Sequence, residues 1–96
     1  MHDDKFVWDE HKNKANSIKH KVSFEEASKV FKDENALFLD DKSHSQDEER
    51  FKLIGFSEKA RLLMVCHFYR NDDSLIRIVS ARKAEIHERV QYERGW

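Results

Sequence analysis

The fold is decided by residues 61–81, which read RLLMVCHFYR-NDDS-LIRIVSA. Between residues 61 and 70 both alternating sets of side chains are apolar, which predicts a central strand buried on its two faces. Residues 71–74 are Asn, Asp, Asp and Ser, and these residue types favour a tight turn. The chain is then predicted to return as a second strand over residues 75–81.

The returning strand contains a cation that its pattern does not explain. Alternation in residues 75–81 defines two faces, one with Ile76, Ile78 and Ser80 and the other with Leu75, Arg77 and Val79. Residues 50–56 precede the central segment and complete a predicted antiparallel meander of three strands. Arg77 interrupts an apolar face of this meander, so it needs a structural or a functional reason.

Two short helices are predicted before the meander. Residues 5–8 read as a short first strand, and Asp9 is a good N-cap for a helix that runs to about residue 19. Ser23 and Glu26 have the Ser-x-x-Glu spacing of a capping box. The apolar residues that follow at helical spacing are Phe24, Ala27, Val30 and Phe31.

The remaining segments complete an α+β pattern. Residues 36–39 are predicted to form a strand, residues 40–49 a polar loop, and residues 83–94 a C-terminal helix with a narrow apolar seam of Ile86 and Val90. A chain of 96 residues is expected to form one domain, because a core this small does not divide in two. We therefore expect a single α+β domain over residues 1–96.

Charge and cysteine content suggest partners and a compartment. Residues 1–50 carry 9 Lys and Arg against 13 Asp and Glu, whereas residues 51–96 carry 9 against 6, so a polyanion would meet the C-terminal half. Cys66 is the only cysteine, which fits a reducing cytoplasm. No segment has the length and hydrophobicity of a membrane helix or the pattern of a signal peptide.

Three separated segments resemble the BrnT family in order and spacing. The first is Trp8-Asp9-Glu10 with Asn13, Asn16 and residues 19–27, Lys-His-Lys-Val-Ser-Phe-Glu-Glu-Ala. The second is His44 with Glu49-Arg50-Phe51 and Ile54-Gly55. The third is residues 76–84, Ile-Arg-Ile-Val-Ser-Ala-Arg-Lys-Ala, with Glu88-Arg89 and Tyr92-Glu93. The chain departs from the family at Lys21, where the family often has Gly after Lys-His. That departure alters the turn between the two N-terminal helices.

The resemblance implies a fold, an activity and a partner. It implies a RelE-like fold and a ribonuclease toxin of a type II toxin–antitoxin system that cleaves RNA, free or on the ribosome, without a metal or other cofactor. It also implies a BrnA-type antitoxin with a ribbon-helix-helix portion, through which the toxin would contact DNA only indirectly. The alternative is a non-catalytic binding module that docks on an antitoxin or on the ribosome.

RNA cleavage of this kind needs cationic donors for the phosphate, and two arginines are the first candidates. Arg77 lies within the predicted last strand and Arg82 at its exit, and a planar guanidinium binds phosphate bidentately. Because one number is odd and the other even, strict alternation would put the two side chains on opposite faces of the sheet. They can share a site only if the strand twists or bulges before Arg82. A structural role remains open for each, with Arg77 as the partner of a carboxylate such as Glu49 and Arg82 as a solvated residue.

Proton transfer has its own candidates near the start of the meander. His44, Glu49 and Arg50 are close in sequence, and a histidine beside a carboxylate can exchange protons at neutral pH. The alternative is a solvated loop with an exposed histidine. We therefore expect His44, Glu49 and Arg50 to belong to the catalytic set with the two arginines.

Further residues are expected to bind RNA. Lys12, Asn16, Lys19 and His20 recur at intervals of three or four, which predicts one polar stripe on the first helix. Of these, Lys19 and His20 match the family segment, and Tyr92 could stack on a base. The alternatives are a helix cap for His20 and core packing for Tyr92. No metal site is expected, because the histidines show no tight pairing with Cys66 or with one another.

Overall fold

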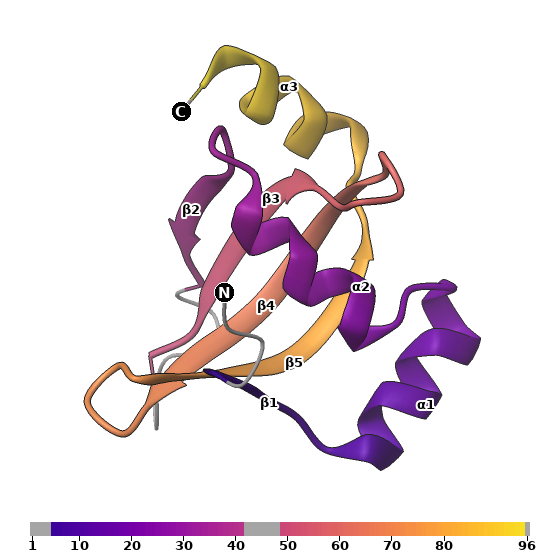
Figure 1. Ribbon diagram of the computed structural model, residues 1–96. Helices are drawn as coiled ribbons and strands as arrows, with labels where there is room; N and C mark the ends of the chain where they lie inside the picture. Colours follow the sequence, from indigo (N-terminus) through magenta and orange to yellow (C-terminus); the bar gives the residue numbers. More distant parts are fainter. Residues whose placement is uncertain (1–4, 42–48, 96) are drawn as a thin grey trace.

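The computed structural model describes residues 5–41 and 49–95 of the chain. Within these residues five strands form one sheet in the order β1-β5-β4-β3-β2 (Figure 1). The strands are β1 (Phe6–Val7), β2 (Leu37–Asp40), β3 (Phe51–Phe56), β4 (Leu62–Arg70) and β5 (Leu75–Lys83). The helices are α1 (Glu10–His20), α2 (Phe24–Lys29) and α3 (Ile86–Arg94), with a 3₁₀ turn, η2 (Val30–Lys32), directly after α2.

The sheet is mixed. Adjacent strands from β2 to β5 pair antiparallel, whereas β1 pairs parallel with β5 through Phe6 and Val7. The α+β class is confirmed, but the expectation of a purely antiparallel sheet is wrong. The position of the next helix accounts for this direction. Strand β1 pairs with Ile76 and Arg77, and α1, which follows it, contacts β5 at Ala81. The chain from β1 to α1 therefore runs in the same direction as β5.

The central strand is β4, as the sequence predicts. It pairs with β3 on one side and β5 on the other, and its residues from Leu62 to Phe68 are all buried. Its odd-numbered side chains, such as Leu63 and Val65, belong to the larger hydrophobic cluster, whereas Leu62 and Met64 belong to the second one. The two apolar sets in the sequence therefore correspond to the two faces of the sheet.

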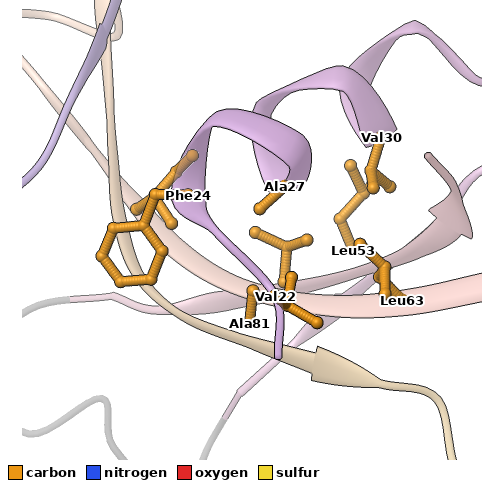
Figure 2. Close-up of a cluster of buried hydrophobic side chains, with 9 residues drawn as sticks. Val22, Phe24, Ala27, Val30, Leu53, Leu63 and Ala81 are labelled. Atoms are coloured by element: carbon orange, nitrogen blue, oxygen red, sulfur yellow. The ribbon is translucent and has the colours of Figure 1, made fainter. Parts of the chain in front are cut away.

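Helix α2 covers one face of the sheet with the apolar residues that its spacing predicts. Phe24, Ala27 and Val30 are fully buried against this face, which Figure 2 shows from close by. Burying a side chain of this kind contributes about 1.5–3 kcal/mol. The complete cluster comprises Val22, Phe24, Ala27, Val30, Leu53, Leu63, Val65, Ile78 and Ala81.

Helix α1 joins the sheet through polar side chains instead. The Asn16 amide donates to the Ala81 carbonyl at 2.8 Å, and its oxygen accepts from the Ala81 N–H at 3.2 Å. Asn16 thus replaces a neighbouring strand beside β5 and protects part of a sheet edge. Asn13 accepts from the Phe24 N–H at 2.8 Å and fixes the start of α2.

Helix α3 differs from the expected C-terminal helix at its start and in its buried face. Strand β5 continues to Lys83, and α3 begins only at Ile86. Ile86 is 84% exposed and Val90 is 45% exposed, so the expected apolar seam faces outward. Glu88 and Tyr92 face inward instead, because each finds a hydrogen-bonding partner there.

Candidate functional site

A β-bulge in β5 changes which side chains share a face. Along β4, Cys66 pairs with Ser80 but the next residue, His67, pairs with Ile78, so Val79 is an extra residue on β5. The strict alternation expected for residues 75–81 is therefore wrong, since Ile78 and Ser80 lie on opposite faces. Beyond a bulge of this kind, each side chain points to the face opposite to the one that strict alternation predicts.

The bulge places Arg77 and Arg82 on the same face of the sheet. Arg77 pairs with Phe68 and Arg82 with Met64, and alternate residues of β4 point to one face. We call this the far face, because it is turned away from α2. The four-residue step from Met64 to Phe68 separates the two arginine backbones by about 13 Å.

Arg77 is half-buried and has no ionic partner in the described part of the chain. No side chain within residues 5–41 and 49–95 forms an ion pair or hydrogen bond with its guanidinium. Its expected structural partner Glu49 is exposed and does not contact it. The guanidinium of Arg77 is therefore available to an anion on the far face.

Arg82 is held by a buried carboxylate of α3. Its two terminal nitrogens each donate to a different oxygen of Glu88 at 2.8 Å, and one also donates to the Lys83 carbonyl at 3.1 Å. Glu88 is 3% exposed, whereas the Arg82 side chain is 27% exposed. The alternative of a solvated Arg82 is therefore wrong, because the residue anchors α3 to the end of β5.

Arg82 nevertheless keeps donors for a second anion. A guanidinium has five N–H groups, and the contacts with Glu88 and Lys83 use three of them. The Nε–H group and one N–H of the second terminal nitrogen remain, and these two lie side by side as a second fork. Burial alone would raise the pKa of Glu88, but hydrogen bonds from Arg82 and from the Glu85 backbone lower it, so Glu88 keeps its charge.

Three side chains at the start of α3 could approach a metal ion. Ligand atoms of Glu85, His87 and Glu88 lie within 4.8 Å of one another. Glu88 already accepts from Arg82 with both oxygens and from the Glu85 N–H at 2.8 Å. A cation would have to compete with the Arg82 guanidinium for Glu88, which makes this group a weak metal site.

Two of the proton-transfer candidates, Glu49 and Arg50, lie at the start of β3. Arg50 is half-buried, and its carbonyl accepts from the Asp41 N–H at 2.8 Å, which continues the pairing of β2 with β3. Glu49 is exposed. His44 lies outside the described residues. The structure therefore places Arg50 and Glu49 at one end of the sheet, and the grouping of all three stays a prediction.

Cys66 lies on the far face but has a weakly reactive thiol. It is buried and donates to Asp41 Oδ2 at 3.7 Å. Burial and the charge of Asp41 raise the pKa of the Cys66 thiol, although the nearby cations of Arg50 and Lys52 oppose this shift. Asp41 contacts the thiol and Lys52 is the cross-strand partner of Cys66, so the far face carries further charged residues.

The polar stripe expected on α1 does not exist as one surface. Asn16 is buried on the sheet side, whereas Lys12 and Lys19 are exposed and His20 is half-buried. Roles for Lys19 and His20 in RNA binding remain predictions.

Tyr92 is engaged in a contact between α3 and the end of η2. Its hydroxyl donates to Asp33 Oδ2 at 2.7 Å, and its ring meets Phe56 edge-on at 5.4 Å. Burial and the hydrogen bond to Asp33 raise the pKa of Tyr92 to about 12. Its packing beside Phe56 differs from the expected packing beside Ile86 and Val90, and a role in RNA binding remains a prediction.

Sequence reasoning missed the ion pair of Glu26 with Arg61. Glu26 has the position of a capping-box acid, and the Ser23 hydroxyl does accept from the Glu26 N–H at 3.0 Å. The Glu26 carboxylate turns away, however, and accepts from both Arg61 and the Ser57 hydroxyl. The hydrogen bonds from Arg61 lower the pKa of Glu26 most strongly. No periodicity connects residues 26 and 61, so this pair had no signal in the sequence.

Comparison with known proteins assigns the family. A family model described as "Ribonuclease toxin, BrnT, of type II toxin-antitoxin system" matches residues 8–88. The chain belongs to the BrnT family. The matched residues include Arg77, Arg82 and Glu88, whereas Tyr92 lies beyond them. A comparison with curated proteins found no match to this chain.

A solved BrnT structure has a similar fold. The crystal structure of the Brucella abortus ribonuclease toxin BrnT matches with a TM-score of 0.63 and 20% sequence identity, over 83% of this chain and 95% of that chain. At this identity the likeness concerns the fold alone. No helix among the described residues of this BrnT-family chain is long and apolar enough to span a membrane.

Proposed function

We propose that the chain is a ribonuclease toxin that cleaves RNA by internal attack of a 2′-hydroxyl on the neighbouring phosphorus. The bond from the 2′-oxygen to phosphorus forms, and the bond from phosphorus to the 5′-oxygen breaks. A base takes the proton of the 2′-hydroxyl, and an acid protonates the leaving 5′-oxygen. The products would be a 2′,3′-cyclic phosphate and a 5′-hydroxyl, and no metal is needed.

The observation that carries this proposal is the shared face of Arg77 and Arg82. Arg77 has a free guanidinium among the described residues, and Arg82 presents a second fork that Glu88 holds in place. Fixed cationic donors of this kind stabilise the charge that builds on the phosphorus oxygens in the transition state. In this scheme Arg77 and Arg82 bind phosphate, and Glu88 is a positioning residue.

The proposal also gives roles to the proton-transfer residues, the RNA-binding residues and the partner protein. Glu49, Arg50 and His44 would supply the base and the acid, since they are the titratable and cationic groups expected near the start of β3. Lys19, His20 and Tyr92 would contact RNA outside the reacting phosphate. Membership of the BrnT family supports an RNA substrate and an antitoxin partner. We further propose a RelE-like relationship, a cytoplasmic location and a BrnA-type ribbon-helix-helix antitoxin.

One observation favours the alternative of a non-catalytic module. The charge of Arg82 is offset by Glu88, so one of the two phosphate candidates is also a structural anchor. A module that only docks on an antitoxin or on the ribosome would keep this anchor and need no chemistry. The two proposals differ in whether the chain breaks RNA, either alone or together with ribosomes.

Incubation of the full chain with end-labelled RNA tests the proposal. We expect fragments that end in a 2′,3′-cyclic phosphate, and we expect RNA with 2′-O-methyl groups to stay intact because its nucleophile is blocked. Parallel assays with and without ribosomes show whether cleavage requires translation. Intact RNA in both assays, with a folded protein, would instead favour the non-catalytic module.

A further inference from the structure

Ser80 stands midway between Arg77 and Arg82 on the far face. Its partner on β4 is Cys66, and the partners of the two arginines are the residues two places before and two places after Cys66. Two residues of a strand span about 7 Å, so the backbone of Ser80 lies roughly that far along the strand from each arginine backbone. An anion that both guanidinium groups contact would therefore meet Ser80 between them.

The bulge at Val79 brings these three polar side chains together. Strict alternation would turn Ser80 and Arg82 to one face and Arg77 to the other, and the extra residue removes this separation. Burial agrees with the register, since Arg77, Ser80 and Arg82 are all half-buried. On the α2 side, β5 presents buried apolar residues, which are Ile76, Ile78 and Ala81. The strand thus carries two guanidinium groups and a hydroxyl on a face that is partly open to solvent.

The Ser80 hydroxyl has no hydrogen-bonding partner within residues 5–41 and 49–95. A serine hydroxyl is a donor as well as an acceptor, and a phosphate oxygen accepts from such a donor. Other serines in the same ranges bind protein groups through their hydroxyls, namely Ser17, Ser23, Ser28 and Ser57. The Ser80 hydroxyl, in contrast, is available to an anion that the arginines hold.

Lys52 approaches the same place from the other side of Cys66. It is the partner of Cys66 on β3, so Lys52, Cys66 and Ser80 form one row across the far face. Two strand spacings separate the backbones of Lys52 and Ser80 by about 10 Å, and lysine carries its ammonium on a flexible four-carbon stem. Lys52 is half-buried and forms no ion pair or hydrogen bond through its ammonium among the described residues. Its ammonium can therefore turn toward an anion near Ser80.

A carboxylate limits where such an anion can bind. Asp41 Oδ2 lies 3.7 Å from the Cys66 sulfur and would repel an anion placed directly over Cys66. Ser80 is on β5, one strand further from β2 and Asp41 than Cys66 is. Glu88, at the exit of β5, already binds Arg82 with both oxygens. The position over Ser80 is therefore the better one for an anion.

We propose that the scissile phosphate of the RNA binds over Ser80, and that the Ser80 hydroxyl and the Lys52 ammonium complete its binding site. The inference rests on the proposed function for its substrate. Arg77 and Arg82 hold the phosphate from two sides along β5, Ser80 donates a hydrogen bond to a phosphate oxygen, and Lys52 adds a third positive charge from β3. Neither Ser80 nor Lys52 forms a covalent bond with the RNA.

The test for Lys52 measures binding of a 2′-O-methyl oligonucleotide, which cannot be cleaved, to the full chain by fluorescence anisotropy at several salt concentrations. Lys52→Met keeps the apolar stem but removes the charge. The slope of log affinity against log salt should therefore become shallower by about 0.7, as for one lost contact with a phosphate of a single strand. Lys52→Arg should restore the slope. Lys32→Met removes the same charge from an exposed position of η2, on the α2 side, and should leave the slope unchanged.

The test for Ser80 uses the same oligonucleotide at one salt concentration. Ser80→Ala should weaken binding about tenfold, as expected when one hydrogen bond to a charged group is lost. Ser80→Thr keeps a hydroxyl at this position and should restore most of the affinity. Ser17→Ala is the matched control, because Ser17 is also half-buried but lies on α1. Melting temperatures show whether each variant is folded.

The two tests can overturn the inference independently of the proposed function. Parent-like binding by Ser80→Ala and Lys52→Met, equal effects of the control substitutions, or a parent that does not bind the oligonucleotide would refute this phosphate site. A parent that binds through Ser80 and Lys52 but leaves cleavable RNA intact, with and without ribosomes, would refute the catalytic proposal and retain the site. A parent that cuts RNA while both variants bind and cut equally well would retain the nuclease and refute the site.

Discussion

Glu88 receives both terminal nitrogens of Arg82 at 2.8 Å, and this pair joins the start of α3 to the exit of β5. The α2 side of the molecule contains a matching pair, in which Glu26 receives Arg61 in the same two-pronged way. Both glutamates are 3% exposed, and both arginines are about a quarter exposed. Of these two pairs, only Arg82–Glu88 lies beside the candidate site. Comparing substitutions in the two pairs therefore distinguishes effects on stability from effects on cleavage.

Arg82→Lys should lower both cleavage and stability. Lysine keeps the charge but cannot make two parallel hydrogen bonds, so we expect cleavage to fall on the order of 10²-fold as one transition-state donor is lost. The weaker contact with Glu88 should also cost roughly 1–2 kcal/mol of unfolding free energy. RNA cleavage per folded molecule and urea unfolding measure the two effects separately.

Arg61→Lys is the control for that experiment. It weakens an equally buried bidentate pair, so the unfolding free energy should fall by a similar amount. Cleavage per folded molecule should stay at the parent level, because Arg61 binds Glu26 and the Lys21 carbonyl on the α2 side. If both lysine variants lost cleavage equally, the loss would follow stability and Arg82 would have no special role.

Arg77→Lys should lower cleavage without lowering stability. Because Arg77 has no ionic partner among the described residues, the substitution should change the unfolding free energy by less than about 0.5 kcal/mol. Loss of the bidentate fork should reduce cleavage on the order of 10²-fold. Arg89→Lys, at an exposed position of α3, is the control and should change neither quantity. A destabilised Arg77→Lys variant with normal cleavage per folded molecule would make Arg77 structural.

The sequence predicts the central strand and α2 well because their buried positions carry apolar residues at regular spacing. Both alternating sets of β4 are apolar and both are buried, and the residues Phe24, Ala27 and Val30 recur at helical spacing and form the core. The free energy gained by burial is roughly proportional to the apolar area removed from water, so a polar residue at these positions would destabilise the fold. Such segments could be placed without any knowledge of their partners.

The candidate site could be predicted only in part, because its geometry depends on long-range contacts. The bulge at Val79 has no glycine to mark it, yet it brings Arg77 and Arg82 to one face. The buried face of α1 is polar, because Asn16 binds the backbone of Ala81. Asn16, which was expected in an exposed polar stripe, is therefore buried against the sheet. These features follow from pairing between distant segments, which local periodicity does not report.

Lys21→Gly should stabilise the fold. Lys21 ends α1 with φ 61° and ψ 30°, a left-handed conformation that costs a non-glycine residue about 1 kcal/mol. Glycine is the usual residue at this position of a helix end, so we expect a gain approaching 1 kcal/mol and a melting temperature several degrees higher. The left-handed backbone of Lys21 is thus a point of local strain. His20→Gly, inside the last turn of α1, should lower the melting temperature instead.

Stability should fall as the pH drops below neutrality because of His67. This side chain is fully buried, its Nδ1 faces the Val65 carbonyl at 3.4 Å, and its Nε2 has no hydrogen-bond partner among the described residues. Burial lowers the pKa of His67 to about 4 from its usual 6.5. Between these values the unfolded chain binds a proton that the folded chain does not, so lowering the pH favours unfolding.

The predicted loss from pH 7 to pH 5 is about 2 kcal/mol, and urea unfolding at the two pH values measures it. His67→Phe should remove most of this pH dependence, whatever its effect on stability at pH 7. His20→Gln, which changes a half-buried histidine at the end of α1, should leave the dependence in place. A His67→Phe variant with the parent's pH dependence would assign the effect to other groups.

Cleavage should persist in EDTA, because the proposed mechanism uses side chains alone. Among the described residues, Glu85, His87 and Glu88 are the group whose ligand atoms come together, and Arg82 already occupies Glu88. A chelator should therefore leave the rate within about twofold of that in buffer. Activity lost in EDTA and restored by a divalent ion would refute the metal-free mechanism. His87→Ala then decides where such an ion binds: it would abolish the restoration if the ion sits on α3, and it would leave the restoration intact if the ion binds elsewhere.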